Sequence, residues 1–556
     1  RSEKGRLDVT LNVVLSTSLD GRRVSPSFNG DPMGPTLRVK PGDTLTVTLN
    51  NKLPPGSDLD RELYKYTHDP RNEISDFVNL TKIFNRLDEF GNGGTSPTFG
   101  FWGLNYVNIH FHGANFDPKI EHLHDALDGG ESEKFIFKIP KNHKTGLFWY
   151  HSHFHGATVA SYMSGLMGFF VIEGTTNDIT QASGIKGAKE AFLMLSEFIA
   201  SPGTKFPRPT FPIAFEFEWI AVTNGHDSIG TNFQFDVGEL VLFRVNSATV
   251  EPTIVISIDN HVMIPVAMDG FPLPVLEEVD TVSLGGGQRI EFLVRFEKAG
   301  SFVMRRAPWA TGSNVTGVEM CNMFFGAAVP NCISYDVPRI IATIEVGSTL
   351  ARKQKPKKLL DAIKLPKVNK YYRKLANKKA VAKKTILLQF DNSYPLFQIP
   401  YDGPFVPPGV AFGINNKLFT PFQSLGTVQS KTCETWDVIS DPPNFEHPFH
   451  VHVSDFLVTH VDGVKLHNPF WGDTVVVYGF NVTIHICFDH LVAGDQLLIH
   501  CHMPSHQDIG MAASYSVIDR KSGKGSKGKK KRSSRRRAQK SIHRGSVRGS
   551  RSSFTV

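Results

Sequence analysis

The chain has 556 residues, of which 40% are hydrophobic, 11% aromatic and 21% charged. This is the composition of a globular protein, so it excludes global disorder and collagen, and the length suits three or four domains. No run of about eighteen apolar residues is present, which excludes a transmembrane helix. The sequence begins with Arg1 instead of Met, so we expect a processed or incomplete chain in which a removed signal peptide is no longer visible.

The net charge of +8 is distributed unevenly along the chain. Residues 521–556 hold 14 Lys and Arg and no acid, whereas residues 351–384 hold 14 Lys and Arg and one Asp. Since these segments carry +14 and +13, the rest of the chain carries −19. An acidic body with two basic appendages argues against a nucleic-acid-binding fold. We interpret 351–384 as a Lys-rich linker with some helical character and 521–556 as a disordered basic tail.

Short runs of alternating hydrophobic and polar residues, separated by Gly and Pro, dominate the sequence. Residues 44–49 and 290–296 are examples, and this period of two predicts antiparallel β-sandwiches. One pattern, a Gly–acid pair before such a run, occurs at 42–47 and 238–243 and in a looser form at 432–438. We therefore expect three copies of one sandwich domain. Their predicted limits are residues 1–175, 180–348 and 385–520.

Ten of the 22 histidines fall in four short clusters that contain His-x-His pairs. They are His110, His112, His151, His153, His447, His450, His452, His500, His502 and His506. Because alternate residues of a strand face the same way, each pair presents two imidazoles to one face, and four pairs can converge on one metal cluster. Cys501, between His500 and His502, faces the opposite way. It can therefore bind a second metal about 10 Å from the first, judged from chain dimensions.

Cys501, His447 and His506, with Met511 as a weak fourth ligand, form the donor set of a blue-copper electron-transfer site. Zinc is the second choice, because structural zinc sites favour CxxC pairs. The middle repeat has no comparable histidines at 254–258 or 302–306. We therefore expect the middle domain to be a spacer, and the cluster to form between the first and third domains.

Taken together, the four motifs resemble those of the multicopper oxidases, the family of laccase and ascorbate oxidase, over about residues 1–520. The phrases around His151, His450 and His502 are most similar to the bacterial, bilirubin-oxidase-like branch. The resemblance implies an all-β fold of three Greek-key cupredoxin domains and four copper ions. It also implies one-electron oxidation of a reductant at a type 1 copper and reduction of dioxygen to water at a cluster of the other three.

The resemblance also implies a role for each ligand. His447, Cys501 and His506 would bind the type 1 copper, with Met511 axial, and His110 and His450 would bind the type 2 copper. The type 3 pair would be bound by His112, His151, His153, His452, His500 and His502.

Two positions depart from the family pattern. Phe111 replaces the usual Trp between the first histidines, and Gln507 replaces the Glu that commonly follows the last type 1 histidine. Because a carboxyl group can relay protons to the cluster and an amide cannot, we look for another acid. Asp128 is our candidate, with Asp508 as an alternative. The competing interpretation is that Asp128 only begins a turn before Gly129.

Three functional hypotheses follow. We favour an oxidase of phenols or similar organic donors over an oxidase of ferrous or cuprous ions, for which Asp441, Glu446 and Asp455 would flank His447. A matrix protein on a retired oxidase fold is the third, although the ligand set is complete. The basic tail would retain a polyanion or acidic matrix, with a nuclear signal and a solvated end as alternatives.

Secretion is our expectation for the localisation. Three sequons begin at Asn79, Asn314 and Asn481 and are compatible with it. Besides Cys501, the chain has four cysteines, and two disulfides or four buried thiols are both open. These cysteines are Cys321, Cys332, Cys433 and Cys487.

Overall fold

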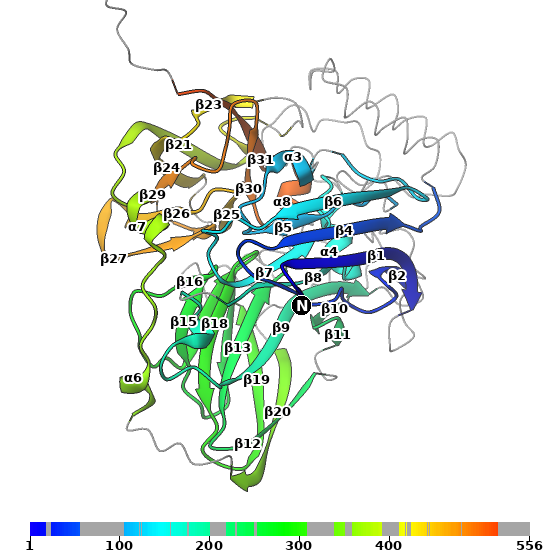
Figure 1. Ribbon diagram of the computed structural model, residues 1–556, viewed down its shortest axis with the longest axis vertical. Coiled ribbons are helices and arrows are strands. Elements are labelled where there is room, and N and C mark those ends of the chain that lie inside the picture. Colours follow the sequence, from blue (N-terminus) through cyan, green and yellow to red (C-terminus); the bar gives the residue numbers. More distant parts are fainter. Residues whose placement is uncertain are drawn as a thin grey trace, which may run out of the picture. The chain divides into compact units, whose positions relative to one another are not determined.

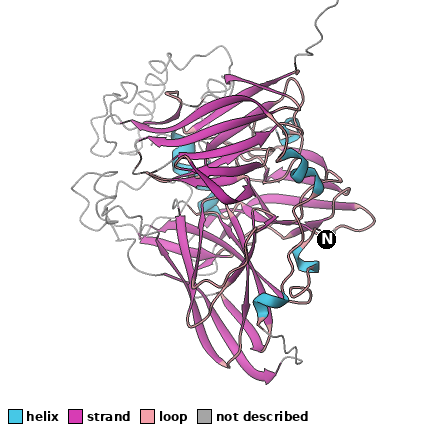
Figure 2. Ribbon diagram, turned by 90° about the vertical axis from the view of Figure 1, so that its left-hand side faces the viewer, coloured by secondary structure: helices cyan, strands magenta, loops and turns pink. Residues whose placement is uncertain are grey.

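The computed structural model describes residues 1–17, 24–55, 105–121, 123, 125–155, 157–174, 177–200, 218–227, 231–249, 253–308, 339–350, 358–391, 411–417, 419, 424–441, 443, 445–479 and 481–520. Their regular structure is mostly β-strand, and the helices are short (Figure 2). In this part of the chain, no helix is long and apolar enough to cross a membrane. The basic tail 521–556, Cys321, Cys332, Asn79 and Asn314 lie outside the described residues.

The first sandwich consists of two four-stranded sheets, in the orders β2-β1-β4-β6 and β3-β8-β7-β5 (Figure 1). Its elements are β1 (Arg6–Thr17), β2 (Val24–Phe28), β3 (Leu37–Val39), β4 (Thr44–Asn51), β5 (His110–His112), α3 (Pro118–Glu121), β6 (Ser132–Lys138), β7 (Gly146–His151), α4 (Thr158–Ser164) and β8 (Met167–Ile172).

The second sandwich has sheets in the orders β11-β10-β9-β13-β18-β15-β16 and β12-β20-β19-β14-β17. A short 3-10 helix, η2 (Ile179–Gln181), precedes it. Its strands are β9 (Lys189–Ala200), β10 (Glu218–Thr223), β11 (His226–Asp227), β12 (Asn232–Val237), β13 (Leu240–Ser247), β14 (Thr253–Ile258), β15 (Ile264–Met268), β16 (Phe271–Pro272), β17 (Thr281–Gly285), β18 (Arg289–Arg295), β19 (Gly300–Pro308) and β20 (Arg339–Leu350).

The third sandwich has sheets in the orders β22-β21-β24-β29-β26-β27 and β23-β31-β30-β25-β28. Two short helices, α6 (Leu359–Ala362) and α7 (Lys370–Leu375), lie between β20 and this sandwich. Its elements are β21 (Ala380–Asp391), β22 (Ala411–Ile414), β23 (Ser424–Gln429), β24 (Cys433–Asp441), β25 (His447–Val451), β26 (Phe456–Val461), β27 (Val464–Gly472), β28 (Thr474–Val477), β29 (Asn481–Cys487), β30 (Gln496–Cys501), α8 (Pro504–Ile509) and β31 (Ala512–Ile518).

The three sandwiches share one pairing scheme. In each, a central strand pairs in parallel with an earlier strand and antiparallel with a later one: β4 with β1 and β6, β13 with β9 and β18, and β24 with β21 and β29. These central strands carry the pattern that recurs along the sequence. The all-β class of three sandwiches is therefore confirmed. β21 begins at Ala380, so residues 380–384 of the expected linker form part of a strand.

The alternating sequence explains which face of each strand is buried. In β6, Phe135 and Phe137 are buried whereas Lys134 and Ile136 are exposed, as a period of two requires. Phe137 contacts Phe111 of the opposite sheet with ring centroids 4.9 Å apart. Burying one such aromatic side chain stabilises the fold by about 1.5–3 kcal/mol. Phe111, the departure from the family pattern, is thus a core residue of the first sandwich.

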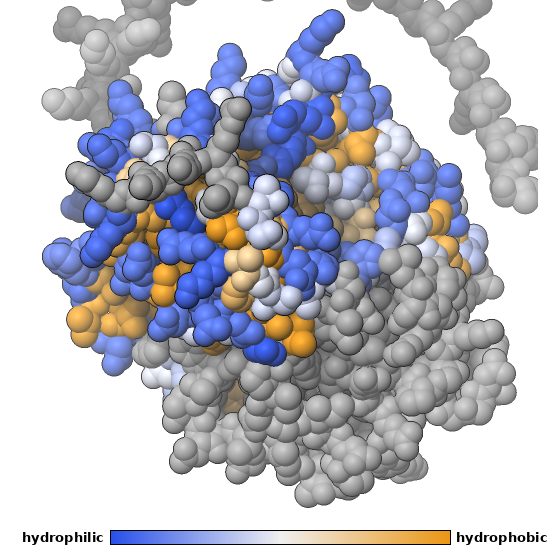
Figure 3. Space-filling model, turned by 90° about the horizontal axis from the view of Figure 1, so that it is seen from below, coloured by the Kyte–Doolittle hydropathy of each residue, from blue (hydrophilic) through white to orange (hydrophobic). Residues whose placement is uncertain are grey.

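Among the described residues, large apolar side chains on the outside are few and scattered. The face shown in Figure 3 has small groups of hydrophobic residues among hydrophilic ones. The exposed large hydrophobic residues belong to all three sandwiches: Leu15, Ile136, Val262, Val275, Val381, Val464 and Val492. Isolated residues of this kind are ordinary on a protein surface.

One disulfide joins Cys433 of β24 to Cys487 of β29, directly opposite each other in the antiparallel pair. For these two cysteines the structure shows a disulfide instead of the buried thiols that the sequence left equally open. The bond closes a segment with a sequence separation of 54 residues, and in the chain-entropy model a loop of this length stabilises the fold by about 4 kcal/mol.

We expect the double variant Cys433→Ser/Cys487→Ser to unfold with a free energy lower by about 4 kcal/mol, because its unfolded chain is less restricted. Denaturant titration of both proteins, with and without a thiol reductant, measures this. The reductant should destabilise the wild type by about this amount more than it does the double variant. A double variant as stable as the oxidised wild type would contradict the prediction.

Candidate metal centre

Strand pairing brings the four histidine motifs together in twos. His110 of β5 lies opposite His151 of β7 in an antiparallel pair. His450 of β25 lies opposite His500 of β30 in another. The first motif therefore meets the second in the first sandwich, and the third meets the fourth in the third sandwich.

Eight imidazoles then gather between these two sandwiches. We call them the eight-histidine group: His110, His112, His151, His153, His450, His452, His500 and His502. Their side chains are at most 3% exposed. The Nε2 atom of His502 lies 3.0 Å from Nδ1 of His112, and the Nε2 atoms of His452 and His500 are 3.0 Å apart. The predicted meeting of the first and third domains is thus observed in the positions of the side chains.

A second group, the cysteine site, contains His447, Cys501 and His506. The Sγ atom of Cys501 lies 3.6 Å from Nδ1 of His447 and 3.6 Å from Nδ1 of His506. Phe412 stacks on the His506 ring at 3.9 Å between centroids. Met511 is fully buried, and its backbone N–H donates to the His506 carbonyl. All four residues proposed from the sequence are therefore close together in the chain's third sandwich.

The donors in both groups fit copper. Burial lowers the pKa of nine imidazoles, so their rings are neutral at pH 7 and offer lone pairs; they are His112, His151, His153, His447, His450, His452, His500, His502 and His506. Five buried ring nitrogens of these two groups have no hydrogen-bond partner: Nε2 of His110, Nε2 of His447, Nε2 of His450, Nδ1 of His452 and Nδ1 of His502. Buried polar atoms without partners are costly, and a metal ion would satisfy them. Imidazole and thiolate together suit copper.

Burial also raises the pKa of the Cys501 thiol to about 12. A thiolate is therefore stable there only with a cation beside it, and a metal that binds at this site must displace the thiol proton.

Glu121, at the end of α3, is an acid in direct contact with the eight-histidine group. Its Oε2 accepts from Nδ1–H of His110 at 2.9 Å, and its Oε1 accepts from the backbone N–H of Phe111 at 2.8 Å. These bonds leave Nε2 of His110 to face the group, which is how a carboxylate commonly orients a metal-binding histidine. Sequence reasoning missed Glu121, and no local pattern distinguished it.

Asp128 is held in a turn. Its Oδ1 accepts from the backbone N–H of Gly129 at 2.7 Å, and its own N–H donates to Glu131. The turn that we considered as its alternative role is thus present, and a proton relay through Asp128 stays a prediction.

Gln507 and Asp508 lie nearer to the eight-histidine group. The Nε2 atom of Gln507 is 3.5 Å from Nδ1 of His153 and donates to the Thr158 hydroxyl. Asp508 is buried. The pKa of Tyr162 is raised well above its ordinary value, mainly by the burial of Tyr162 and to a smaller extent by the charge of Asp508. The Tyr162 hydroxyl is in turn 3.4 Å from Nε2 of His151.

Asp473, between β27 and β28, connects the eight-histidine group to a buried ion-pair network. Its Oδ1 lies 3.2 Å from Nε2 of His112, and Arg289 of β18 donates to both of its oxygens, at 2.7 and 2.6 Å. Lys144 of the first sandwich donates to it at 3.2 Å. Burial alone would raise the pKa of Asp473, but the charges of Arg289 and Lys144 hold it well below its ordinary value. The carboxylate is therefore ionised beside His112.

The middle sandwich supplies more than spacing, and our expectation of a mere spacer was wrong. Besides Arg289, the side chain of Gln288 donates to the Thr474 carbonyl at 3.0 Å. Gly287 lies against His502: a Cβ atom there would be 2.6 Å from two ring carbons. The turn before β18 therefore packs against the His502 ring of the third sandwich.

The three acids that flank His447 in the sequence have different surroundings. Asp455 is buried and bonded to Lys144, and it accepts from the Tyr372 hydroxyl at 2.7 Å. Burial raises the pKa of Glu446 to about 7. Asp441 is exposed at the end of β24. Of the three acids that the metallo-oxidase alternative would use, only Asp441 is exposed.

Comparison with known proteins identifies the class. Three family models, each described as multicopper oxidase, match residues 104–177, 149–322 and 382–521, which together make up more than half of the chain. The chain belongs to the multicopper oxidase family and is accordingly a copper-dependent oxidoreductase.

Individual relatives agree with this. The chain is 23% identical over 468 residues to laccase-2 of Trametes villosa, covering 74% of this chain and 78% of that one. Among solved structures, a multicopper oxidase from Campylobacter jejuni described as a metallo-oxidase gives a TM-score of 0.67 at 19% identity, covering 93% of both chains. A laccase-like multicopper oxidase from Ochrobactrum sp. gives 0.64 at 19% identity, covering 93% of this chain and 98% of that one. At these identities the structures support the fold.

We expect Gly287→Ala to weaken metal binding by the eight-histidine group by about 10–100-fold, because the new methyl group pushes the His502 ring out of place. Copper content after dialysis against a graded chelator measures this. Gly238→Ala is the matched control: Gly238 has a similar φ of +85° against +82°, but no atom lies within 4 Å of an added Cβ. Equal copper retention in the two variants would exclude the contact as the cause.

Proposed function

We propose that this protein takes single electrons from an organic donor at the cysteine site and uses four of them to reduce dioxygen to water at the eight-histidine group. A type 1 copper would be bound by His447, Cys501 and His506, with Met511 axial. His110 and His450 would hold a type 2 copper. The type 3 pair would be held by the other six histidines of the group: His112, His151, His153, His452, His500 and His502. Bound copper supplies the one-electron redox chemistry.

The observation that carries the proposal is the position of Cys501 between His500 and His502 on one strand end. Its thiol faces His447 and His506, while His500 lies 3.0 Å from His452. One peptide unit joins Cys501 to His500, and another joins it to His502. Covalent bonds therefore connect the two groups of proposed ligands. Electrons accepted beside Cys501 have a path of about 10 Å to the imidazoles where dioxygen is reduced.

Two features of the eight-histidine group support its proposed role in reducing dioxygen. One O₂ takes up four electrons and four protons and leaves as two molecules of water. The buried imidazoles hold the site away from bulk water, and Glu121 and Asp473 orient His110 and His112 through hydrogen bonds. Asp508 beside Tyr162, and Asp128, are our candidates for proton delivery.

We favour an organic donor because two of the three acids that flank His447 in the sequence are not available to bind a metal ion. A site for ferrous or cuprous ions needs exposed carboxylates, and Asp455 is already bonded to Lys144 and Tyr372. Glu446 is buried. The metallo-oxidase function named for the Campylobacter structure is the alternative. Export from the cell and retention of a polyanion by the basic tail complete the proposal.

Cys501→Ser should abolish both the blue absorption of a cysteine-bound cupric ion and the oxidase activity, because it removes the ligand and the electron path. Serine is nearly isosteric, so circular dichroism should show a folded protein. Met511→Leu is the matched control: the axial thioether is a weak ligand, so its blue colour should persist. Turnover retained by the Cys501 variant would refute the assignment.

The donor can be identified by comparing phenols with ferrous iron on the copper-loaded protein. We expect kcat/KM for the better phenols to exceed that for ferrous iron by about tenfold or more, equivalent to about 1.4 kcal/mol of activation free energy. Asp441→Asn should leave both values unchanged. A selective loss of ferrous oxidation in that variant would favour the metallo-oxidase instead.

A further inference from the structure

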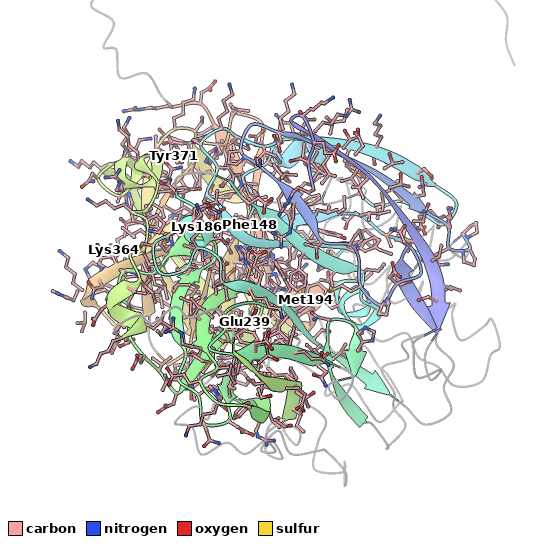
Figure 4. All side chains as sticks on the ribbon, turned by 60° about the horizontal axis from the view of Figure 1, so that its bottom comes forward. Phe148, Lys186, Met194, Glu239, Lys364 and Tyr371 are labelled. Atoms are coloured by element: carbon pink, nitrogen blue, oxygen red, sulfur yellow. A yellow bond between two sulfur atoms is a disulfide. The ribbon has the colours of Figure 1, made fainter. Side chains whose placement is uncertain are left out.

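Four of the chain's 11 methionines surround one small cavity between the first and second sandwiches. They are Met33, Met163, Met167 and Met194. Met163 lies in α4, Met167 begins β8, and Met194 lies on β9, where Figure 4 labels it. α4 packs against β9, so segments of both sandwiches enclose the space (Figure 1).

The size of the cavity limits what it can hold. Its volume is about 10 Å³, which is room for about one water molecule. Organic ligands occupy pockets of about 300–1,000 Å³, so an aromatic donor is excluded. A single ion is the largest ligand that this space takes without rearrangement.

The chemistry of the lining selects the kind of ion. Among the described residues that line it, none is a carboxylate, an imidazole or a thiol. The oxygen atoms of the lining are neutral, among them the hydroxyls of Tyr162, Ser164 and Ser196. A divalent cation would therefore lose its hydration shell there without gaining an anionic ligand. Thioether sulfur is a soft donor that suits Cu(I). The lining therefore fits a monovalent soft ion, and one of its sulfurs is already shown to accept a polar group, since Asn246 donates to Met194 Sδ at 2.9 Å.

The cavity lies between the protein surface and the eight-histidine group. Met33 is partly exposed, Met163 is 9% exposed, and Met167 and Met194 are 1% exposed. Tyr162 also lines the cavity, and its hydroxyl is 3.4 Å from Nε2 of His151. One side chain thus separates the methionines from the imidazoles.

From this arrangement we propose that Met33, Met163, Met167 and Met194 form a binding site for monovalent copper, from which the ion passes Tyr162 to the eight-histidine group during metal loading. The binding of the ion is independent of the proposed function, whereas its delivery rests on it. The ion stays monovalent and only exchanges thioether for imidazole ligands. The competing explanation is that flexible methionines merely fill a gap in the core.

Silver(I), which has the charge of Cu(I) and no redox chemistry here, tests the binding. Calorimetry on the copper-loaded protein should detect one tight silver ion per chain, and Met33→Leu/Met163→Leu should lose it. Met304→Leu, at a fully buried methionine of the second sandwich, is the matched control and should retain it. Zinc(II) should bind the wild type and the double variant alike. Silver binding that is the same in all three proteins would overturn the proposal and favour gap filling.

Metal loading tests the delivery. Copper-free protein is mixed anaerobically with Cu(I), and protein-bound copper is measured at intervals after a chelator quench. We expect the double variant to fill about tenfold more slowly than the wild type, corresponding to about 1.4 kcal/mol, and to reach the same final copper content. Because copper content is measured without a reductant, the result is separable from the donor and activity of the proposed function. Equal rates would overturn the delivery step, and with it the proposal.

Discussion

The ion pair between Arg289 and Asp473 is the interaction on which the rest of the structure depends. Both side chains are at most 2% exposed, and the guanidinium donates to both carboxylate oxygens. Lys144 joins from the first sandwich, so charges from all three sandwiches meet at one point. A buried charge without its partner costs about 3–5 kcal/mol. The network is therefore compensated only when all three sandwiches are docked.

This docking is also what assembles the metal site. His112 and His502 are 390 residues apart in the sequence, and their nitrogens approach to 3.0 Å only across the junction of the first and third sandwiches. Asp473 takes part in both arrangements, because it contacts His112 as well as Arg289. Metal binding and domain docking therefore stabilise each other. When docking forms the site, the free energy of metal binding contributes to the stability of the docked fold. The middle sandwich, without the histidine motifs, contributes through Arg289 and Gly287.

Local sequence patterns predicted strands correctly where the same strand recurs in more than one sandwich. The alternation in β6 and the Gly–acid pairs before β4 and β13 predicted strands, and the strands occupy equivalent places in their sandwiches. Residues 351–384 were harder to interpret, because charge dominates their composition. Part of this segment, from Ala380, pairs with β24 in a sheet. A strand with exposed lysines is recognised only from the strand it pairs with, because surface positions carry little hydrophobic pattern.

By itself, the sequence determined which histidines and which cysteine we propose as ligands, and the strand fold that presents them. Spacing by two places both histidines of a pair on one face, and that is a property of a single strand. Tertiary structure alone decided which groups orient those ligands: Glu121 at His110, Asp473 at His112 and Gly287 beneath His502. Asp473 and Gly287 act on ligands more than 200 residues away in the chain, and Glu121 reaches His110 only through the fold of a short helix. Such contacts arise from how separate elements pack, a relation that no local periodicity records.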